Sequence, residues 1–313
     1  MNNQNKIIPL FFAVDDNYVP HLCVALRSII DNCSKNYFYH INVLIEELTT
    51  DSKNAIRQFE SEKISVKFYS VTQKLRGICA RLHLRDYYTK ATYYRFFIPE
   101  MFPEYSKGIY LDCDIVVNAD ISKLYSKPLG GCLAGAMPEE VITDIDTFGT
   151  YSEKVLGVPR YRYFNAGIMV MNLTEMRKFH IEERFAELIG KRTFSVAQDQ
   201  DYLNVLCYGR VAYISKWWNK TPMPNSNEER KPYIVHYKIN FKPWRYDDIP
   251  YAEYFWEYAE KTQFYGYFLN SKKNYSNGEK ERDSLQYENL LKLAKEESEA
   301  CQFDASALFM EVI

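Results

Sequence analysis

The sequence of 313 residues contains no long apolar run and carries little net charge. No apolar stretch approaches the ~20 residues that a membrane-spanning helix needs. The apolar run at residues 7–14 is too short, and too soon followed by Asp15 and Asp16, to be the apolar region of a signal peptide. The net charge of -2 provides no whole-chain attraction for nucleic acid. We therefore expect a cytoplasmic protein that does not bind nucleic acid.

Cysteine pairs and a dinucleotide fingerprint are also missing. The seven cysteines are an odd number, and they show neither a C-x-x-C pair nor zinc-like spacing. We expect free thiols at Cys23, Cys33, Cys79, Cys113, Cys132, Cys207 and Cys301. No G-x-G-x-x-G follows the first apolar run, which argues against a dinucleotide enzyme.

Strand-like and helix-like segments alternate through the first half of the chain. The apolar run at residues 7–14 is typical of a central strand covered on both faces, and residues 22–30 carry apolar side chains at helical spacing. Further strands are expected at residues 41–45 and 64–71, and a helix at residues 89–97. This order predicts an α/β domain with a largely parallel sheet.

The second half has a weaker pattern. Residues 138–163 show little periodicity and predict a loop, whereas residues 164–173 are a mainly apolar stretch that contains Asn165. A helix at residues 197–208 and a strand at 233–237 follow. Residues 270–283 are polar and predict a linker, and residues 284–300 predict an amphipathic helix with Leu285, Leu290, Leu291 and Ala294 on one face. We expect a catalytic domain over residues 1–264 and a linker with a helical tail over residues 265–313.

The triplet Asp112-Cys113-Asp114 lies between the apolar runs 108–111 and 115–117. It therefore predicts a buried strand that ends in two carboxylates one residue apart. Two anions brought together at a strand end repel each other and lose hydration, so a cation is needed nearby. Mg²⁺ or Mn²⁺ suits such oxygen ligands and leaves positions open for a diphosphate.

Three classes of protein use closely spaced aspartates in this way. An EF-hand loop is excluded because Val116 and Val117 stand where a ligand and a glycine are needed. A haloacid-dehalogenase-type phosphatase would use Asp112 as nucleophile and Asp114 as acid/base. A nucleotide-sugar transferase would hold a metal with the same pair. The last two stay open on these residues alone.

Other polar residues stand at chemically suggestive places. Asp15 and Asn17 follow the first strand, where ligands of open α/β sheets bind, although a simple turn explains them equally well. His236 ends a late strand, and Lys242 follows in a loop held by Pro243, so the two residues are candidates for a metal ligand and a phosphate contact.

Six blocks, taken in chain order, resemble glycosyltransferase family 8, which includes bacterial lipooligosaccharide α-galactosyltransferases and is related to glycogenin. The resemblance covers about residues 7–260. The blocks are FAVDDNY at 12–18, ATYYR at 91–95, YLDCD at 110–114, FNAG at 164–167, DQD at 199–201 and HYKINFKPW at 236–244.

The resemblance implies a GT-A fold, α/β with a mixed sheet and here a C-terminal helical appendage. It also implies retaining transfer of a hexose from UDP-galactose or UDP-glucose, with Mn²⁺ as the usual metal and Mg²⁺ as the alternative. By matching blocks, the metal ligands are Asp112, Asp114 and His236. The remaining expected UDP or donor contacts are Ala13, Val14, Asp15, Asn17, Arg95, Cys113 and Lys242. The expected catalytic residues around the transferred sugar are Asn165, Asp199 and Gln200.

One departure from the family pattern concerns the last block. The family usually has glycine three residues after the histidine, and this chain has Ile239, whose side chain would push the backbone from the diphosphate. Glu139 and Asp144 are candidates for a donor-sugar loop that is not otherwise recognisable. The acceptor is expected to be a saccharide, free, lipid-linked or protein-linked. Peripheral contact with the inner face of a membrane, a homo-oligomer and a turnover-poor sugar-nucleotide-binding module stay open.

Overall fold

The computed structural model describes residues 6–76, 78, 82, 90–223 and 230–301. The chain divides into two compact units, each assembled from separate stretches. Unit 1 consists of Met1–Val71, Gly108–Pro128 and Ser215–Lys280. Unit 2 consists of Thr72–Lys107, Leu129–Ile214 and Glu281–Ile313.

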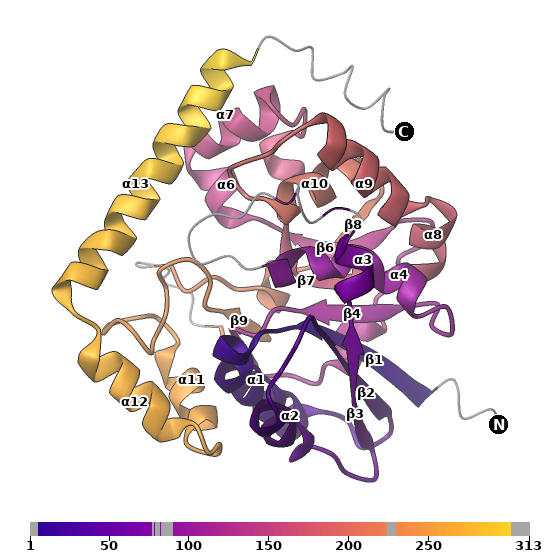
Figure 1. Ribbon diagram of the computed structural model, residues 1–313, viewed down its shortest axis with the longest axis vertical. Helices are drawn as coiled ribbons and strands as arrows, with labels where there is room; N and C mark the ends of the chain where they lie inside the picture. The colour runs from indigo at the N-terminus through magenta and orange to yellow at the C-terminus, as the bar shows by residue number, and fades with distance from the viewer. Residues whose placement is uncertain (1–5, 77, 79–81, 83–89, 224–229, 302–313) are drawn as a thin grey trace. The chain divides into compact units, whose positions relative to one another are not determined.

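A parallel four-stranded sheet forms the centre of unit 1 (Figure 1). β1 (Ile7–Ala13) lies between β2 (Phe38–Ile45) and β4 (Gly108–Leu111), and β3 (Ile64–Ser70) pairs with the other edge of β2. All four residues of β4 are buried, as expected for a strand covered on both faces. The predicted strands of the first half and their parallel arrangement are confirmed.

The helices of unit 1 pack around this sheet. The predicted helix at residues 22–30 is α1 (Val19–Asn32), which packs against β5 (Ile115–Val117), α2 (Thr50–Arg57) and α11 (Ala252–Ala259). β5 forms a short antiparallel pair with β9 (Ile234–His236). The remaining elements of unit 1 are η2 (Asp16–Tyr18), α5 (Ser122–Tyr125), η6 (Lys216–Trp218), α12 (Tyr265–Asn274) and the start of α13 (Asn277–Ala300).

Unit 2 has a smaller mixed sheet. β7 (Phe164–Met171), buried along its whole length, runs antiparallel to β6 (Ala134–Pro138), and β6 runs parallel to β8 (Val211–Tyr213). The sheets therefore form the mixed α/β architecture that was expected. Its helices are α3 (Thr72–Arg76), η4 (Lys90–Phe97), α4 (Ile98–Met101), α6 (Glu140–Asp144), α7 (Asp146–Lys154), η5 (Arg160–Arg162), α8 (Leu173–Lys178), α9 (Ile181–Lys191), α10 (Asp199–Leu206) and most of α13.

The loop predicted for residues 138–163 is wrong, because this stretch contains α6 and α7. Both helices are short and include poor helix formers such as Gly149, so the sequence shows little helical period. Buried side chains stabilise them instead: Val141 and Ile142 in α6, and Phe148 and Tyr151 in α7. Tertiary packing here outweighs local propensity.

The linker predicted at residues 270–283 is also helical, apart from Tyr275 and Ser276. α12 is attached through Phe268, which is fully buried in an aromatic cluster with Trp244, Phe255 and Tyr258. The polar sequence of this segment is typical of a linker, and a single buried residue such as Phe268 gives too little periodicity to indicate a packed helix. The amphipathic face predicted for α13 is only partly right, since Ala294 is buried but Leu285 is 59% exposed.

Two further expectations concern cysteines and membranes. The six cysteines within the described residues are free thiols, as predicted, and Cys79 lies outside those residues. Among the described helices, none combines the length and the apolar character that crossing a bilayer requires.

The burial of Phe268 predicts that α12 is an integral part of unit 1. Replacing Phe268 by alanine should lower the free energy of unfolding by about 3–5 kcal/mol, because the cavity left in the cluster cannot collapse fully. Leu269→Ala is the matched control, since Leu269 is 46% exposed and its loss should cost less than about 1 kcal/mol. Urea denaturation of the full chain measures both. Equal effects of the two substitutions would contradict this role of α12.

Candidate active site

Two half-buried carboxylates lie at the end of β4, in the turn that joins β4 to β5. The side chains of Asp112 and Asp114 are 28% and 13% exposed. The Tyr110 hydroxyl donates to Oδ1 of Asp112 over 3.1 Å, and the Cys113 thiol donates to the Ala13 carbonyl over 3.5 Å. The predicted strand ending in an acid pair is confirmed, and Cys113 ties that pair to the end of β1.

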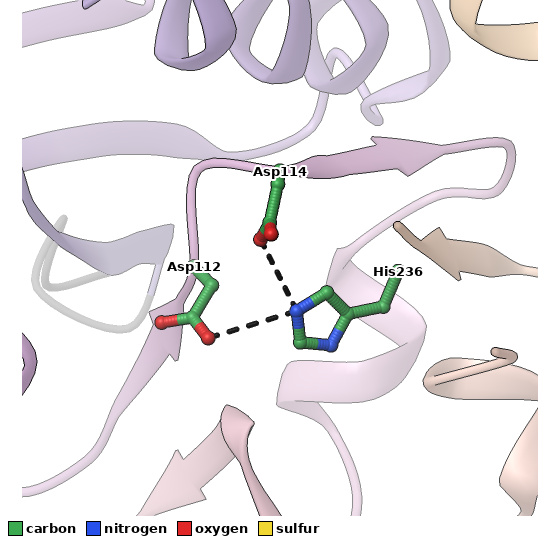
Figure 2. A group of neighbouring side chains, drawn as sticks. All are labelled: Asp112, Asp114 and His236. Atoms are coloured by element: carbon green, nitrogen blue, oxygen red, sulfur yellow. Dashed lines mark ion pairs between the residues drawn. The ribbon is translucent and has the colours of Figure 1, made fainter. Parts of the chain in front are cut away.

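His236 reaches the acid pair because β9 is antiparallel to β5, with His236 opposite Ile115. Its Nε2 lies 3.1 Å from Oδ1 of Asp114 and 3.6 Å from Oδ2 of Asp112, as Figure 2 shows. One ligand atom from each of these three residues lies within 4.8 Å of the others. Strand pairing thus assembles a group whose members are far apart in the sequence.

Asn219 determines which ring nitrogen of His236 faces the carboxylates. The amide oxygen of Asn219 lies 2.9 Å from Nδ1, so Nδ1–H donates to it and Nε2 directs a lone pair toward Asp112 and Asp114. Two carboxylates and an imidazole lone pair directed at one point are stable only around a cation. Two hard oxygens and one imidazole nitrogen fit a divalent metal such as Mn²⁺ or Mg²⁺.

Lys242 supplies a positive charge at the same place. Its ammonium group pairs with Oδ2 of Asp114, and both residues lie in a nearly dry environment. Burial by itself would raise the pKa of Asp114, but the ammonium group of Lys242 lowers that pKa well below its ordinary value. Burial lowers the pKa of Lys242, an effect that Asp114 partly offsets. The site therefore holds an ionised Asp114 next to a cation.

Ile239 lies in the turn between His236 and Lys242, with a φ of 55°. The amide of Phe241 donates to the carbonyl of Lys238 across this turn over 3.2 Å. Left-handed backbone strongly favours glycine, and a β-branched residue there is strained. The backbone at Ile239 thus adopts a conformation typical of glycine. The isoleucine side chain does not force the backbone out of the left-handed region.

The end of β1 carries the residues predicted to contact uridine and ribose. Asp15 is half-buried and caps η2, where its Oδ1 accepts from the amide of Tyr18 over 3.2 Å. Asn17 is exposed and Ala13 half-buried, whereas Val14 is buried and its amide donates to the Leu44 carbonyl. Any contact of Val14 with a nucleotide would therefore use its backbone. The nucleotide role of these residues stays a prediction.

The three predicted catalytic residues lie together in unit 2. Asp199 is buried and pairs with Arg95, whose Nε lies 3.1 Å from Oδ2 of Asp199. Thr92 donates to the other oxygen of Asp199, and Arg95 also donates to the Ala166 carbonyl. Arg95 is thus buried among protein groups, and its predicted contact with the donor stays a prediction.

Gln200 and Asn165 share a hydrogen-bond network. Oε1 of Gln200 accepts from Nδ2 of Asn165 over 3.1 Å and from the amide of Ala166 over 2.9 Å. Asn165 also donates to Oε2 of Glu139, a buried carboxylate at the start of α6. Glu139 therefore belongs to this group. Asp144, the other candidate for the donor-sugar loop, is the last residue of α6. The contact shared by Glu139 and Asn165 places the two residues in one cluster.

Three residues that contact these groups escaped the sequence-based predictions: Asn219 beside His236, Tyr163, which accepts from Gln200, and Asp201, which accepts from Tyr163. Asn219 has no local signal, because its role depends on facing a histidine 17 positions away. Tyr163 immediately precedes the FNAG block, and Asp201 ends the DQD block, so their positions beside known blocks were the available signal. Both are fully buried, which a sequence cannot show.

The fold is that of the GT-A glycosyltransferases. The crystal structure of the galactosyltransferase LgtC in complex with donor and acceptor sugar analogues superposes with a TM-score of 0.70. The two sequences are 24% identical, and the superposition covers 83% of this chain and 99% of that chain.

Sequence comparison defines the family within that class. Residues 9–248 match the glycosyl transferase family 8 model, and the chain belongs to this family. General stress protein A of Bacillus subtilis (strain 168) is 27% identical over an alignment of 288 positions, which covers 83% of this chain and 96% of that protein. Lipopolysaccharide 1,2-glucosyltransferase of Escherichia coli (strain K12) is 24% identical over an alignment of 265 positions, which covers 77% of this chain and 74% of that protein.

The contact between Asn219 and His236 predicts an effect on metal binding. Asn219→Ala should weaken Mn²⁺ binding about 10- to 100-fold, because His236 loses the partner that orients its ring. Asn219→Asp keeps an oxygen acceptor for Nδ1–H and should retain most of the affinity. Isothermal titration calorimetry with UDP present measures both. Wild-type affinity in Asn219→Ala would show that Asn219 does not orient the ligand.

The positive φ of Ile239 predicts a strained turn. Ile239→Gly should be about 1 kcal/mol more stable to unfolding than Ile239→Ala, because both variants lose the side chain but only glycine relieves the backbone. Chemical denaturation of the two variants measures this difference directly. Equal stabilities would contradict the strain at this position.

Proposed function

We propose that the chain is a retaining glycosyltransferase that moves a hexose from a UDP-sugar to a saccharide or glycoconjugate acceptor, with a divalent metal on the diphosphate. The observation that carries this proposal is the convergence of Asp112, Asp114 and His236 on one point, with Lys242 beside them. Family 8 membership supports transfer from a sugar nucleotide and favours it over the phosphatase alternative.

The transferred hexose is proposed to be galactose or glucose. Support comes from two similar proteins, one named a galactosyltransferase and the other a lipopolysaccharide glucosyltransferase. The acceptor is proposed to be a saccharide, free or linked to lipid or protein. Mn²⁺ is the proposed metal and Mg²⁺ the alternative.

Departure of UDP is the difficult step, because negative charge develops on the diphosphate. A bound divalent metal supplies Lewis-acid stabilisation of that charge. The chain's own contribution is Lys242, a buried ammonium group already held in place by Asp114. A preorganised cation in a dry site stabilises developing negative charge more than a solvated one does.

The sugar is proposed to be positioned by Asp199, Gln200 and Asn165. Gln200 is a poor nucleophile, because its carbonyl oxygen already accepts hydrogen bonds from Asn165 and from the amide of Ala166. We therefore favour front-face attack by the acceptor over a double displacement through Gln200. Arg95 is proposed to serve this site by orienting Asp199, with which it forms a buried ion pair.

Three broader aspects belong to the same proposal. Residues 1–264 are proposed to supply the catalytic function and residues 265–313 to be a C-terminal extension, of which residues 302–313 lie outside the described residues. The protein is proposed to be cytoplasmic, where contact with the inner face of a membrane would bring it to a lipid-linked acceptor. Association into a homo-oligomer is a further proposal, measurable by light scattering.

The metal site predicts the outcome of a simple substitution. Asp112→Asn should lower Mn²⁺-dependent release of UDP from UDP-galactose or UDP-glucose by about 100-fold or more, because one anionic ligand is lost. Asp114→Asn should lower UDP release by a similar factor, and so should EDTA added to the wild-type protein. Asp247→Asn is the control, since Asp247 is 75% exposed and pairs with Lys272 at the surface of the same unit.

Each alternative function predicts a different result in this assay. Full UDP release in EDTA, or by Asp112→Asn, would sink the proposed metal-dependent transfer. A phosphatase would release phosphate from a monoester and form an aspartyl intermediate at Asp112. A turnover-poor module would bind UDP-sugars without hydrolysing them or transferring the sugar to any acceptor.

A further inference from the structure

Asp201 is a carboxylate with no exposed surface, and protein donors occupy both of its oxygens. The Tyr163 hydroxyl donates to Oδ1 over 2.6 Å. The Tyr151 hydroxyl and the amide of Ala197 donate to Oδ2 over 2.9 Å and 2.8 Å. Tyr151 and Tyr163 are themselves fully buried, so Asp201 and the two tyrosines form a dry cluster, here named the Asp201 cluster.

Tyr163 connects the Asp201 cluster to Gln200. Its hydroxyl oxygen accepts from Nε2 of Gln200 over 3.3 Å. Because Oε1 of Gln200 accepts from Asn165 and Ala166, the two ends of the carboxamide have different partners. A flipped amide would direct N–H groups at two donors and its oxygen at a hydroxyl whose proton is already donated. The network therefore permits one orientation of Gln200.

The charge of Asp201 is what makes Tyr163 an acceptor. Burial raises the pKa of Asp201 to about 6, although the hydrogen bonds from Tyr163, Ala197 and Tyr151 act to lower that pKa. The carboxylate is therefore largely ionised at neutral pH. An ionised carboxylate only accepts hydrogen bonds, so it draws the Tyr163 proton to itself and leaves a lone pair for Gln200. Tyr93, Tyr202 and Glu297 are the other titratable groups that interact with Asp201.

The same carboxylate spans a strained turn. Gln198, which directly precedes α10, has φ 50° and ψ -120° and is fully buried. Such a backbone persists only where its surroundings hold it. Asp201 accepts the amide of Ala197 on one side of Gln198, and its own amide donates to the Gln198 carbonyl over 3.1 Å. Asp201 thus holds the start of α10, where Asp199 and Gln200 lie.

We propose that Tyr163 is a positioning residue which, anchored by Asp201, fixes the orientation of the Gln200 carboxamide toward the transferred sugar. This inference rests on the proposed function, in which Gln200 contacts that sugar. It gives Tyr163 and Tyr151 different roles although both donate to the same buried carboxylate. The Tyr163 hydroxyl both donates to Asp201 and accepts from Gln200, whereas the Tyr151 hydroxyl donates to Asp201.

Tyr151→Phe and Tyr163→Phe form a matched pair for the test, because each removes one buried hydroxyl from Asp201 and keeps the ring. In Mn²⁺-dependent transfer by the full chain, Tyr163→Phe should lower kcat about 10- to 100-fold, since a misplaced group near the reacting atoms is costly. KM for the UDP-sugar should stay within about threefold. Tyr151→Phe should change kcat by less than about threefold.

A second readout does not depend on activity. The side-chain amide protons of Gln200, assigned by comparison with Gln200→Glu, should exchange faster with water and shift in the NMR spectrum of Tyr163→Phe. In Tyr151→Phe they should stay close to their wild-type positions. Thermal unfolding of both variants gives the structural cost that the two substitutions share.

The outcomes separate this inference from the proposed function. An active wild type with wild-type kcat in Tyr163→Phe would overturn the role of Tyr163. Equal losses of kcat in both variants would also overturn it, because the hydroxyls would then act only through stability. If the wild type releases no UDP from any donor, the proposed function fails, and an unchanged Gln200 amide signal in Tyr163→Phe overturns the positioning role.

Discussion

Two carboxylates one residue apart at the end of a buried strand are the constraint on which unit 1 depends. Asp112 and Asp114 are partly withdrawn from water, so their charges must be balanced by protein cations or a bound one. Lys242 pairs with Asp114, and His236 reaches both carboxylates through the pairing of β9 with β5. Asn219 then fixes the ring that faces them. The strained turn at Ile239 lies between two of these partners.

Unit 2 meets a related requirement with hydrogen bonds and an ion pair between protein groups. Asp199 is balanced by Arg95, and Asp201 by two tyrosine hydroxyls and a backbone amide. Glu139 accepts from Asn165. Each buried carboxylate thus has its own partners, and the half-buried Gln200 is held between these groups. Buried polar networks of this kind specify one arrangement of side chains.

The parts of the fold that could be predicted are those with strong local patterns. A continuous apolar run predicted β1, and helical spacing predicted α1, because burial on both faces or on one face leaves a direct trace in the sequence. α7 and α12 were missed because each depends on a few buried aromatic side chains, such as Phe148 or Phe268, within otherwise polar segments. Leu285 was placed on a buried face because periodicity does not reveal whether a partner surface exists.

The sequence by itself determined the acid pair and its apolar flanks, the order of the six family blocks and the requirement for a nearby cation. These follow from residue types and spacing, which are local properties of the chain. Only the tertiary structure decided that Lys242 pairs with Asp114, that Asn219 orients His236, and that Tyr163 and Asp201 hold Gln200. Those contacts join residues brought together by strand pairing and burial, and no short stretch of sequence encodes which distant side chain will arrive.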